Sequence, residues 1–292
     1  MKKIFRSLLF VPSSSEKMLN KIDVLNPDAF ILDLEDSVPF ALKELARNNI
    51  KKKLETIDEN SKINIFIRAN ELCTDNFYKD IEETISTKII GYVIPKFENT
   101  NSLKKAFKFI SNKESEKGIQ IGKIKFILMI ENPKGVLELS KINNFDQRIL
   151  ALAIGWEDFT REINVFTDVT DNLLDFVRMT VLICAKANGL LAIDTVYKNF
   201  SDSQGLKSEA IKILKMGFNG KFAIHPNQID IINSCFIPTN EEIGKMEVIL
   251  KNKDKFEQEG AININGAMYD PPHLKWALKL KEYLNEIERK GY

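Results

Sequence analysis

The sequence predicts a (β/α)8 barrel, an α/β fold also called a TIM barrel, followed by a C-terminal helical extension. Short apolar runs alternate with longer amphipathic ones over about 235 residues, close to the usual barrel length of about 250. A doubly wound open sheet is the alternative, but it normally carries a glycine-rich turn after its first strand. Here that turn is Pro12-Ser13-Ser14-Ser15, which favours the barrel.

The short apolar runs are the predicted strands. They are Phe5–Val11, Ala29–Leu34, Ile63–Ile67, Ile89–Ile94, Lys125–Ile130, Leu150–Ile154, Leu190–Ile193 and Lys221–Ile224. Helical spacing of apolar residues falls between them, for example over Ala41–Leu54, Asn172–Asn188 and Ser203–Met216. The alternation of strand and helix indicates parallel strands.

The character of the chain changes after Pro238. We therefore assign residues 1–238 to a barrel that carries the site and residues 239–292 to a C-terminal extension or lid. The extension is expected to hold a charged helix over 240–258, a linker-like stretch over Glu259–Gly266, and a last helix ending near Arg289. It is expected to be too small for a core of its own.

Composition excludes several functional classes. Lys and Arg total 42 against 41 Asp and Glu, so a net charge of +1 gives no field to attract nucleic acid or an anionic membrane. Only His225 and His273 are present, which argues against a histidine zinc site and a Ser-His hydrolase. The three cysteines show no paired spacing, and no stretch is apolar enough to span a membrane. A reducing, cytoplasmic location is expected.

Charged residues gather at the carboxyl ends of the predicted strands, where barrel enzymes place their active sites. Glu131 closes the fifth strand and Asp158 follows the sixth, and carboxylates so placed suit a hard cation such as Mg²⁺. An anionic substrate fits the arginine and lysine beside them. The remaining strand ends carry Asp33-Leu34-Glu35-Asp36, Arg68, Pro95-Lys96, Asp194 and His225-Pro226.

These residues also have simpler interpretations. An acid after a buried strand is commonly a helix cap, and Glu35 and Asp36 can serve as partners of the next helix dipole. Arg68 can pair with one of these acids or recognise a substrate carboxylate. Lys96 can be a Schiff-base nucleophile or merely a charge. His225 is more simply a hydrogen-bonded structural residue.

Eight ordered motifs together resemble the citrate lyase β-subunit family, which includes the malyl-CoA and citramalyl-CoA lyases. The resemblance covers nearly the whole chain, and the ordered set is specific although each motif is weak. The motifs are Arg6-Ser7-Leu8-Leu9-Phe10-Val11-Pro12, Asp33-Leu34-Glu35-Asp36-Ser37-Val38, Ile94-Pro95-Lys96, Ile130-Glu131-Asn132-Pro133-Lys134-Gly135, Ile154-Gly155-Trp156-Glu157-Asp158, Ile193-Asp194-Thr195-Val196-Tyr197, Gly217-Phe218-Asn219-Gly220-Lys221 and Ile224-His225-Pro226-Asn227-Gln228-Ile229.

The resemblance implies a Mg²⁺-dependent lyase, with Mn²⁺ as a possible substitute, that cleaves a carbon–carbon bond in a β-hydroxyacyl thioester. The products are an acetyl thioester and a 2-keto acid or glyoxylate. By match of motif, Glu131 and Asp158 hold the metal, Arg68 binds and polarises the substrate, and Glu35 and Asp36 orient metal-bound water. The same match places Arg6, Lys96, Gly155 and Trp156 at the substrate.

The resemblance also implies partners. Gly266-Ala267-Met268-Tyr269-Asp270-Pro271 is similar to the family's lid motif, in which Asp270 is the acid/base that reaches into a neighbouring subunit's site. A homotrimer or a larger assembly is then expected, with no nucleic-acid or membrane partner. The thioester is carried either by CoA or by the acyl-carrier subunit of a citrate lyase complex, and the residues leave both open.

Two departures from the family pattern stand beside the metal ligands: Asn132 replaces a usual Thr or Ser, and Trp156 replaces a usual small residue. The indole of Trp156 is expected to narrow the pocket or shift specificity. Two other functions stay open, namely a Schiff-base aldolase that uses Lys96 and a non-catalytic barrel that serves as a scaffold.

Overall fold

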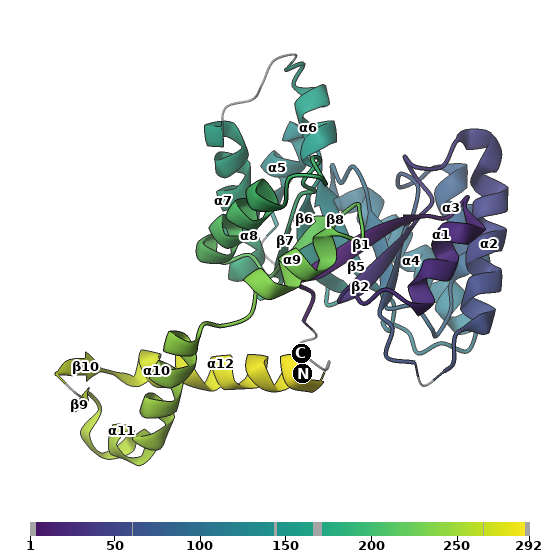
Figure 1. Ribbon diagram of the computed structural model, residues 1–292. Helices are drawn as coiled ribbons and strands as arrows, with labels where there is room; N and C mark the ends of the chain where they lie inside the picture. Colours follow the sequence, from purple (N-terminus) through teal and green to yellow (C-terminus); the bar gives the residue numbers. More distant parts are fainter. Residues whose placement is uncertain (1–3, 60, 143–144, 166–170, 265, 290–292) are drawn as a thin grey trace. The chain divides into compact units, whose positions relative to one another are not determined.

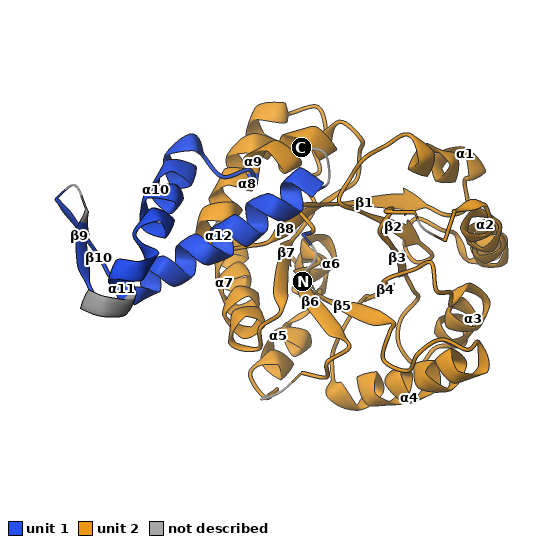
Figure 2. Ribbon diagram, turned by 90° about the horizontal axis from the view of Figure 1, so that it is seen from below, with its two compact units in different colours: residues 1–4, 236–292 blue, residues 5–235 orange. Residues whose placement is uncertain are grey.

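The computed structural model describes residues 4–59, 61–142, 145–165, 171–264 and 266–289. The chain divides into two compact units, one of residues 5–235 and one of residues 236–292 with the first four residues (Figure 2). Within the described residues, no helix is both long and apolar enough to cross a membrane.

The larger unit is a closed barrel of parallel strands, so the predicted fold is confirmed and the open sheet is excluded (Figure 1). Each strand pairs with the next in the chain, and the last pairs with the first. The strands are β1 (Ser7–Pro12), β2 (Ala29–Asp33), β3 (Ile65–Arg68), β4 (Gly91–Ile94), β5 (Lys125–Ile130), β6 (Ile149–Ile154), β7 (Leu191–Asp194) and β8 (Gly220–Ala223).

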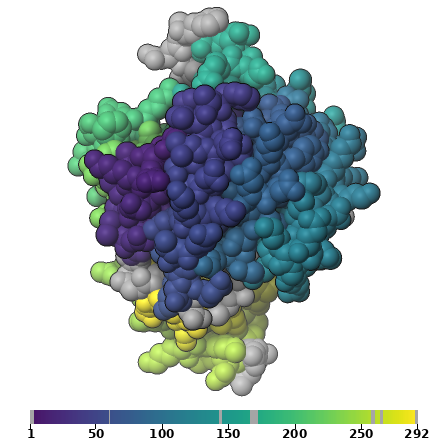
Figure 3. Space-filling view, turned by 90° about the vertical axis from the view of Figure 1, so that its right-hand side faces the viewer, coloured from purple at the N-terminus to yellow at the C-terminus, as the bar shows by residue number. Residues whose placement is uncertain are grey.

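Helices surround the strands, as the end-on view in Figure 2 shows. Figure 3 shows the outer face on which α1, α2, α3 and α4 follow one another around the barrel. The helices are α1 (Glu16–Leu19), α2 (Lys43–Thr56), α3 (Asp75–Thr84), α4 (Thr100–Glu116), α5 (Pro133–Leu139), α6 (Trp156–Glu162), α7 (Asp171–Ala187), α8 (Ser203–Met216) and α9 (Gln228–Cys235), with 3-10 turns η1 (Asn20–Asp23) and η2 (Phe40–Leu42).

Several predicted boundaries differ from the structure by one or two residues, and two of these differences have local reasons. Helix α2 begins two residues later than expected, because the chain after Pro39 first forms the 3-10 turn η2. Strand β1 begins at Ser7, while Phe5, expected to lie in the strand, instead packs in the barrel core just before it. Apolar character therefore extends beyond the hydrogen-bonded strand, since residues that close the end of the barrel are buried too.

Alternate residues along the strands fill the barrel interior. Ile31, Phe66 and Met129 belong to this single apolar cluster. Because strand side chains alternate between faces, the residues two positions further along, Asp33, Arg68 and Glu131, continue the same inward series. This periodicity brings charged groups together at the carboxyl end of the barrel.

The smaller unit departs from expectation in three respects. Instead of one charged helix, α10 (Asn240–Lys251) and α11 (Lys253–Glu259) are separated at Asn252. Instead of a linker, β9 (Ile262–Ile264) and β10 (Ala267–Tyr269) form an antiparallel pair, consistent with the Asn-Gly hairpin signal between them. Helix α12 spans Pro271–Arg289, and the unit has a small apolar core of its own, formed by Met246, Ile249, Phe256, Ile262 and Ala277.

Candidate active site

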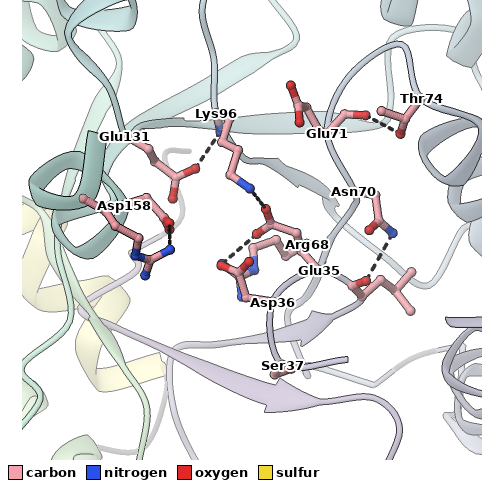
Figure 4. Close-up of polar contacts among 12 residues, drawn as sticks. Glu35, Asp36, Ser37, Arg68, Asn70, Glu71, Thr74, Lys96, Glu131 and Asp158 are labelled. Atoms are coloured by element: carbon pink, nitrogen blue, oxygen red, sulfur yellow. Dashed lines mark hydrogen bonds and ion pairs between the residues drawn. The ribbon is translucent and has the colours of Figure 1, made fainter. Parts of the chain in front are cut away.

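Arg68 lies at the centre of a buried ion cluster at the carboxyl ends of β2 and β3 (Figure 4). Its Nε and Nη2 atoms donate to Oδ1 and Oδ2 of Asp33 at 2.7 and 2.6 Å, a two-pronged contact between neighbouring strands. Asp33 also accepts the backbone N–H groups of Glu35 and Ser37. Burial acts to raise the pKa of Asp33, but the charge and hydrogen bonds of Arg68 outweigh it and keep that pKa below its usual value. Asp33 is therefore an ionised anchor for Arg68.

The third nitrogen of Arg68 faces two further acids. Nη1 lies 3.0 Å from Oε2 of Glu35 and 3.4 Å from Oδ2 of Asp36, and the guanidinium carbon lies 4.8 Å from the centroid of the Phe10 ring. Burial acts to lower the pKa of Arg68, but the charges of Asp33 and Glu35 outweigh it and raise that pKa. Arg68 thus pairs with several acids, and its contact with substrate stays a prediction.

Lys96 bridges two carboxylates. Its ammonium Nζ lies 2.9 Å from Oε1 of Glu35, and its backbone N–H donates to Oε2 of Glu131 at 2.6 Å. The residue has φ of +49°, an uncommon left-handed conformation for a side chain other than glycine. Burial acts to lower the pKa of Lys96, but the ion pair with Glu35 outweighs it and raises that pKa. Lys96 is therefore a charged ammonium at neutral pH.

Glu131 is a buried carboxylate, only 2% exposed. It lies against Gly155, where an added Cβ would come within 2.2 Å of Oε1. Burial, together with the negative charges of Glu35 and Asp158, raises the pKa of Glu131 to about 8. The backbone N–H of Lys96 and the charge of Arg68 offset this only in part. The site thus concentrates negative charge that a cation would stabilise.

Asp158, in the first turn of α6, lies beside Glu131 (Figure 4). Its Oδ1 accepts from Nη1 of Arg161 at 2.6 Å, and the Arg161 side chain is 74% exposed. The backbone N–H of Trp156 donates to Oγ1 of Thr195, and the indole stacks on Phe159. Asp158 can turn from Arg161 towards a bound cation at small cost, since exposed ion pairs contribute little.

The donors present fit Mg²⁺ better than a metal that needs a complete protein cage. Within the described ranges, no three His, Cys, Asp or Glu side chains form a ready metal-binding group. Mg²⁺ usually keeps several waters and takes only one or two carboxylates from the protein. Glu131 and Asp158 supply two carboxylates, and the pKa of Glu131 is raised first by burial and then by the negative charges of Glu35 and Asp158.

Arg6 lies apart from the other residues predicted to contact substrate. It precedes β1, at the amino end of the barrel, and its side chain is fully buried and paired with Asp28, with 2.8 Å between Nε and Oδ2. Its side chain therefore lies away from the carboxyl-end mouth, and the contact of Arg6 with substrate stays a prediction. Its backbone N–H donates to Asp28 as well, which indicates a role in closing the bottom of the barrel.

Asp194 was expected among the acids of the mouth, and the structure corrects this expectation. It lies one position after the inward Ile193, so its side chain points outward between the barrel and the helices. There it pairs with Arg178 of α7 at 2.8 Å and with Lys221 of β8 at 2.7 Å. A charged residue at the end of a strand faces the site only when it belongs to the inward-pointing series of alternate residues, and Asp194 belongs to the outward-pointing series.

The two histidines have local partners. His225, after β8, stacks on Phe200 and accepts a hydrogen bond from the backbone of Asn227, consistent with the structural interpretation. In the smaller unit, His273 of α12 contacts the carboxylate of Asp270 through Nδ1, and this hydrogen bond lowers the pKa of Asp270. The acid/base role of Asp270 stays a prediction.

Sequence reasoning missed two residues that hold the acid-rich loop after β2, Lys43 and Asn70. Both donate to the backbone carbonyl of Leu34. Lysine at the first position of a helix is an unfavourable choice, and this is the signal that was available in the sequence.

Comparisons with known proteins find relatives over nearly the whole chain. Residues 6–226 match the family described as HpcH/HpaI aldolase/citrate lyase. The citrate lyase subunit beta of Leuconostoc mesenteroides subsp. cremoris is 29% identical, covering 96% of this chain and 93% of the relative. The human mitochondrial citramalyl-CoA lyase is 30% identical, covering 98% and 87%. The CitE protein of Mycobacterium tuberculosis, solved with magnesium, acetoacetate and coenzyme A, superposes with a TM-score of 0.73 at 24% identity over 100% of both chains.

Proposed function

The chain belongs to the HpcH/HpaI aldolase/citrate lyase family, and we propose that it is a Mg²⁺-dependent lyase acting on a β-hydroxyacyl thioester. The reaction breaks a carbon–carbon bond and releases an acetyl thioester and a 2-keto acid or glyoxylate. The observation that carries this proposal is Glu131, a buried carboxylate whose pKa is raised to about 8 beside Glu35 and Asp158. Such a group favours a cation among its neighbours.

Glu131 and Asp158 are the residues proposed to hold the metal, with Mn²⁺ as a possible substitute for Mg²⁺. A bound divalent ion would act as a Lewis acid and as a template for the carboxylate and adjacent oxygen of the substrate. Glu35 and Asp36 face the same space and are proposed to orient water there. Glu35 suits this role because Lys96 and Arg68 fix its two oxygens.

Lys96 and Arg68 supply the positive charge that an anionic substrate needs. The Lys96 side chain is about one-third exposed, at 36%, and its raised pKa keeps it charged. On Arg68, Nη1 has the longest contacts, at 3.0 and 3.4 Å, so it is the nitrogen best able to turn to a substrate oxygen. Gly155 and Trp156 complete the proposed substrate contacts, the first by leaving space beside Glu131.

Carbon–carbon cleavage needs a proton to leave and a proton to return. The hydroxyl proton passes to the water that Glu35 and Asp36 are proposed to orient, the electron pair of the broken bond passes to the thioester carbonyl, and the resulting enolate takes a proton on carbon from the protonated form of an acid. We assign this last proton to Asp270, which also removes it in the reverse direction. The proposal includes delivery of Asp270 from a neighbouring copy in a homotrimer or larger assembly, because a closed site protects an enolate from water.

The alternative enzymatic function is a Schiff-base aldolase that uses Lys96 as its nucleophile. The contacts of Lys96 argue against this function. A lysine nucleophile must lose its proton, which requires a lowered pKa. The ion pair with Glu35 raises the pKa of Lys96 instead. Borohydride treatment in the presence of pyruvate or glyoxylate is expected to give no covalent adduct; a trapped adduct on Lys96 would establish the aldolase.

The direct test is cleavage of citramalyl-CoA and malyl-CoA by the purified chain, in the presence of Mg²⁺ and in the presence of EDTA. The measured quantity is the rate of acetyl-CoA formation. Metal-dependent turnover is expected. Adjacent acids of α6 give a matched pair: Asp158→Asn is expected to abolish turnover, whereas Glu157→Gln, at a residue paired with Lys198 on the surface, is expected to keep it. Turnover that survives both EDTA and Asp158→Asn would contradict the proposal.

The same experiment distinguishes the two carriers of the thioester and the scaffold alternative. Turnover of a CoA thioester without partner subunits would establish a stand-alone CoA lyase. Tight Mg²⁺ binding without turnover would point to a citryl group on an acyl-carrier subunit, to be tested with that subunit added. Full function of a Glu131→Ala protein in cells would instead favour a non-catalytic barrel.

A further inference from the structure

Lys43, the first residue of α2, reaches back over the loop that follows β2. Its Nζ atom donates to the backbone carbonyl of Leu34 at 2.6 Å and to that of Glu35 at 2.8 Å. Both carbonyls belong to the acid-rich loop, and the side chain of Glu35 faces Lys96 and Arg68. Lys43 is thus bonded to the backbone of a proposed site residue without facing the substrate space itself.

The placement of Lys43 is energetically costly. A cation at the start of a helix opposes the helix dipole, and a buried ammonium loses its hydration. Lys43 is only 9% exposed, and no carboxylate among the described residues forms an ion pair with it. Burial lowers the pKa of Lys43, and the negative charges of Asp80 and Asp33 offset this shift only in part. A neutral or polar residue would be a cheaper start to this helix.

A second donor converges on the same carbonyl. Nδ2 of Asn70, two residues after β3, donates to the Leu34 carbonyl at 3.1 Å and to Oδ2 of Asp80 at 2.6 Å. Asp80 of α3 is fully buried and accepts from Nη1 of Arg47 on α2. The loop carbonyl is therefore held by side chains from two directions, each fixed by packed helices.

We propose that Lys43 is a positioning residue for catalysis, which holds the loop backbone so that Glu35 faces the site. This inference rests on the proposed lyase function. It deepens that function by adding a residue outside the substrate space on which the rate depends. Loss of the ammonium lets the carbonyls of Leu34 and Glu35 turn to other donors, and the Glu35 carboxylate then moves with its backbone.

A double-mutant cycle separates positioning from general structural support. Lys43→Met is expected to lower kcat about 10- to 100-fold, the cost of a displacement near 1 Å, while KM changes little. In a Glu35→Gln background the same change is expected to lower kcat only about twofold or less, since the group that Lys43 positions is already gone. An equal fall in both backgrounds would overturn the proposal.

Lys53→Met is the matched control. Lys53 lies on the same helix and is similarly buried, but it pairs with Asp23 and not with the loop. Its effect on kcat, if any, is expected to be the same in both backgrounds.

Hydrogen exchange gives a readout that does not depend on activity. The amide protons of Glu35 and Ser37, which are donated to Asp33, are expected to exchange at least about tenfold faster in Lys43→Met than in Lys53→Met. Equal exchange in the two variants would overturn the positioning role. Absence of lyase activity in the wild-type chain would defeat the proposed function, while this measurement still decides whether Lys43 holds the loop. If Lys43→Met does not fold, Lys43→Ala, which also removes the ammonium and favours a helix, takes its place with the same expected rise in exchange.

Discussion

Glu131 lies directly against Gly155: a Cβ added at residue 155 would come within 2.2 Å of its Oε1 and 2.7 Å of its carboxyl carbon. Gly155 has φ of −107°, which other residues adopt readily, so glycine is not needed here for its backbone conformation. Its lack of a side chain instead leaves room for the carboxylate of Glu131. The end of β6 is thus shaped to admit the carboxylate that ends β5. This relationship defines how the proposed metal site is built.

Gly155→Ala is therefore expected to displace Glu131 and to weaken Mg²⁺ binding at least about tenfold, the order of effect that misplacing a ligand produces. Isothermal titration with Mg²⁺ measures this. Gly244→Ala is the control, because a Cβ on that helical glycine meets nothing within 4 Å and alanine favours a helix. Equal Mg²⁺ affinity of Gly155→Ala and wild type would show that Glu131 is not the ligand.

The pH dependence of stability follows from Glu131. Its pKa is about 8 in the folded chain against an ordinary value of 4.5, so between these values the folded chain holds a proton that the unfolded chain has released. Without metal, this contribution to stability is full below about pH 4.5 and is lost as the pH rises through 8. Thermal unfolding in EDTA is expected to show Tm of the wild type falling from pH 6.5 to 9 relative to Glu131→Gln.

Saturating Mg²⁺ should reverse this trend, because the cation replaces the proton and binds more tightly as the pH rises. The stabilisation of the wild type by Mg²⁺ is expected to grow from pH 6.5 to 8.5. Glu131→Gln should show little stabilisation at any pH. A Mg²⁺ effect that is independent of pH would contradict the assignment of Glu131.

Lys96 has two proposed roles that substitution can separate: its backbone N–H holds Glu131, and its ammonium supplies positive charge for the substrate. Lys96→Gly keeps the backbone N–H that donates to Glu131 and suits the left-handed φ of +49°, but it removes the ammonium. We expect Mg²⁺ affinity to stay within about threefold of wild type, while kcat/KM falls at least about tenfold from loss of a charged contact. Lys96→Val, β-branched and strained at that φ, is expected to lose both. Equal Mg²⁺ affinity in the two variants would exclude a backbone role for residue 96.

Arg68→Lys keeps a positive charge but loses the two-pronged contact with Asp33. We expect a fall of about 2–3 kcal/mol in the free energy of unfolding, typical of buried hydrogen bonds to charged groups. Urea unfolding measures this. Arg289→Lys, at an exposed pair with Glu286, is expected to change the same quantity by less than about 0.5 kcal/mol. A comparably small change at Arg68 would show that its geometry is unimportant to the fold.

The alternation of apolar runs was enough to predict the barrel, and the predicted Lys125–Ile130 and Ser203–Met216 coincide with β5 and α8. It was not enough for the hairpin of β9 and β10, since strands of three residues give little periodic signal. Boundaries elsewhere moved by one or two residues, and at Phe5 the reason is that a buried apolar residue lies just outside the strand.

The site shows the same division. The sequence by itself determined which chemical groups stand at the strand ends, among them Arg68, Lys96 and Glu131, because strand position is a local property. The alternation of inward and outward residues that directs Asp194 outward was also present in the sequence. The prediction from strand ends did not use this alternation.

Only the tertiary structure decided which groups meet. Arg68 and Asp33 are 35 residues apart, as are Lys96 and Glu131. Arg6 is held at the opposite end of the barrel by Asp28. Parallel register and closure of the barrel set these neighbours, and burial among them then sets the protonation of Glu131. Local sequence patterns carry no information on either, because both depend on charges and on loss of water contributed by distant parts of the chain.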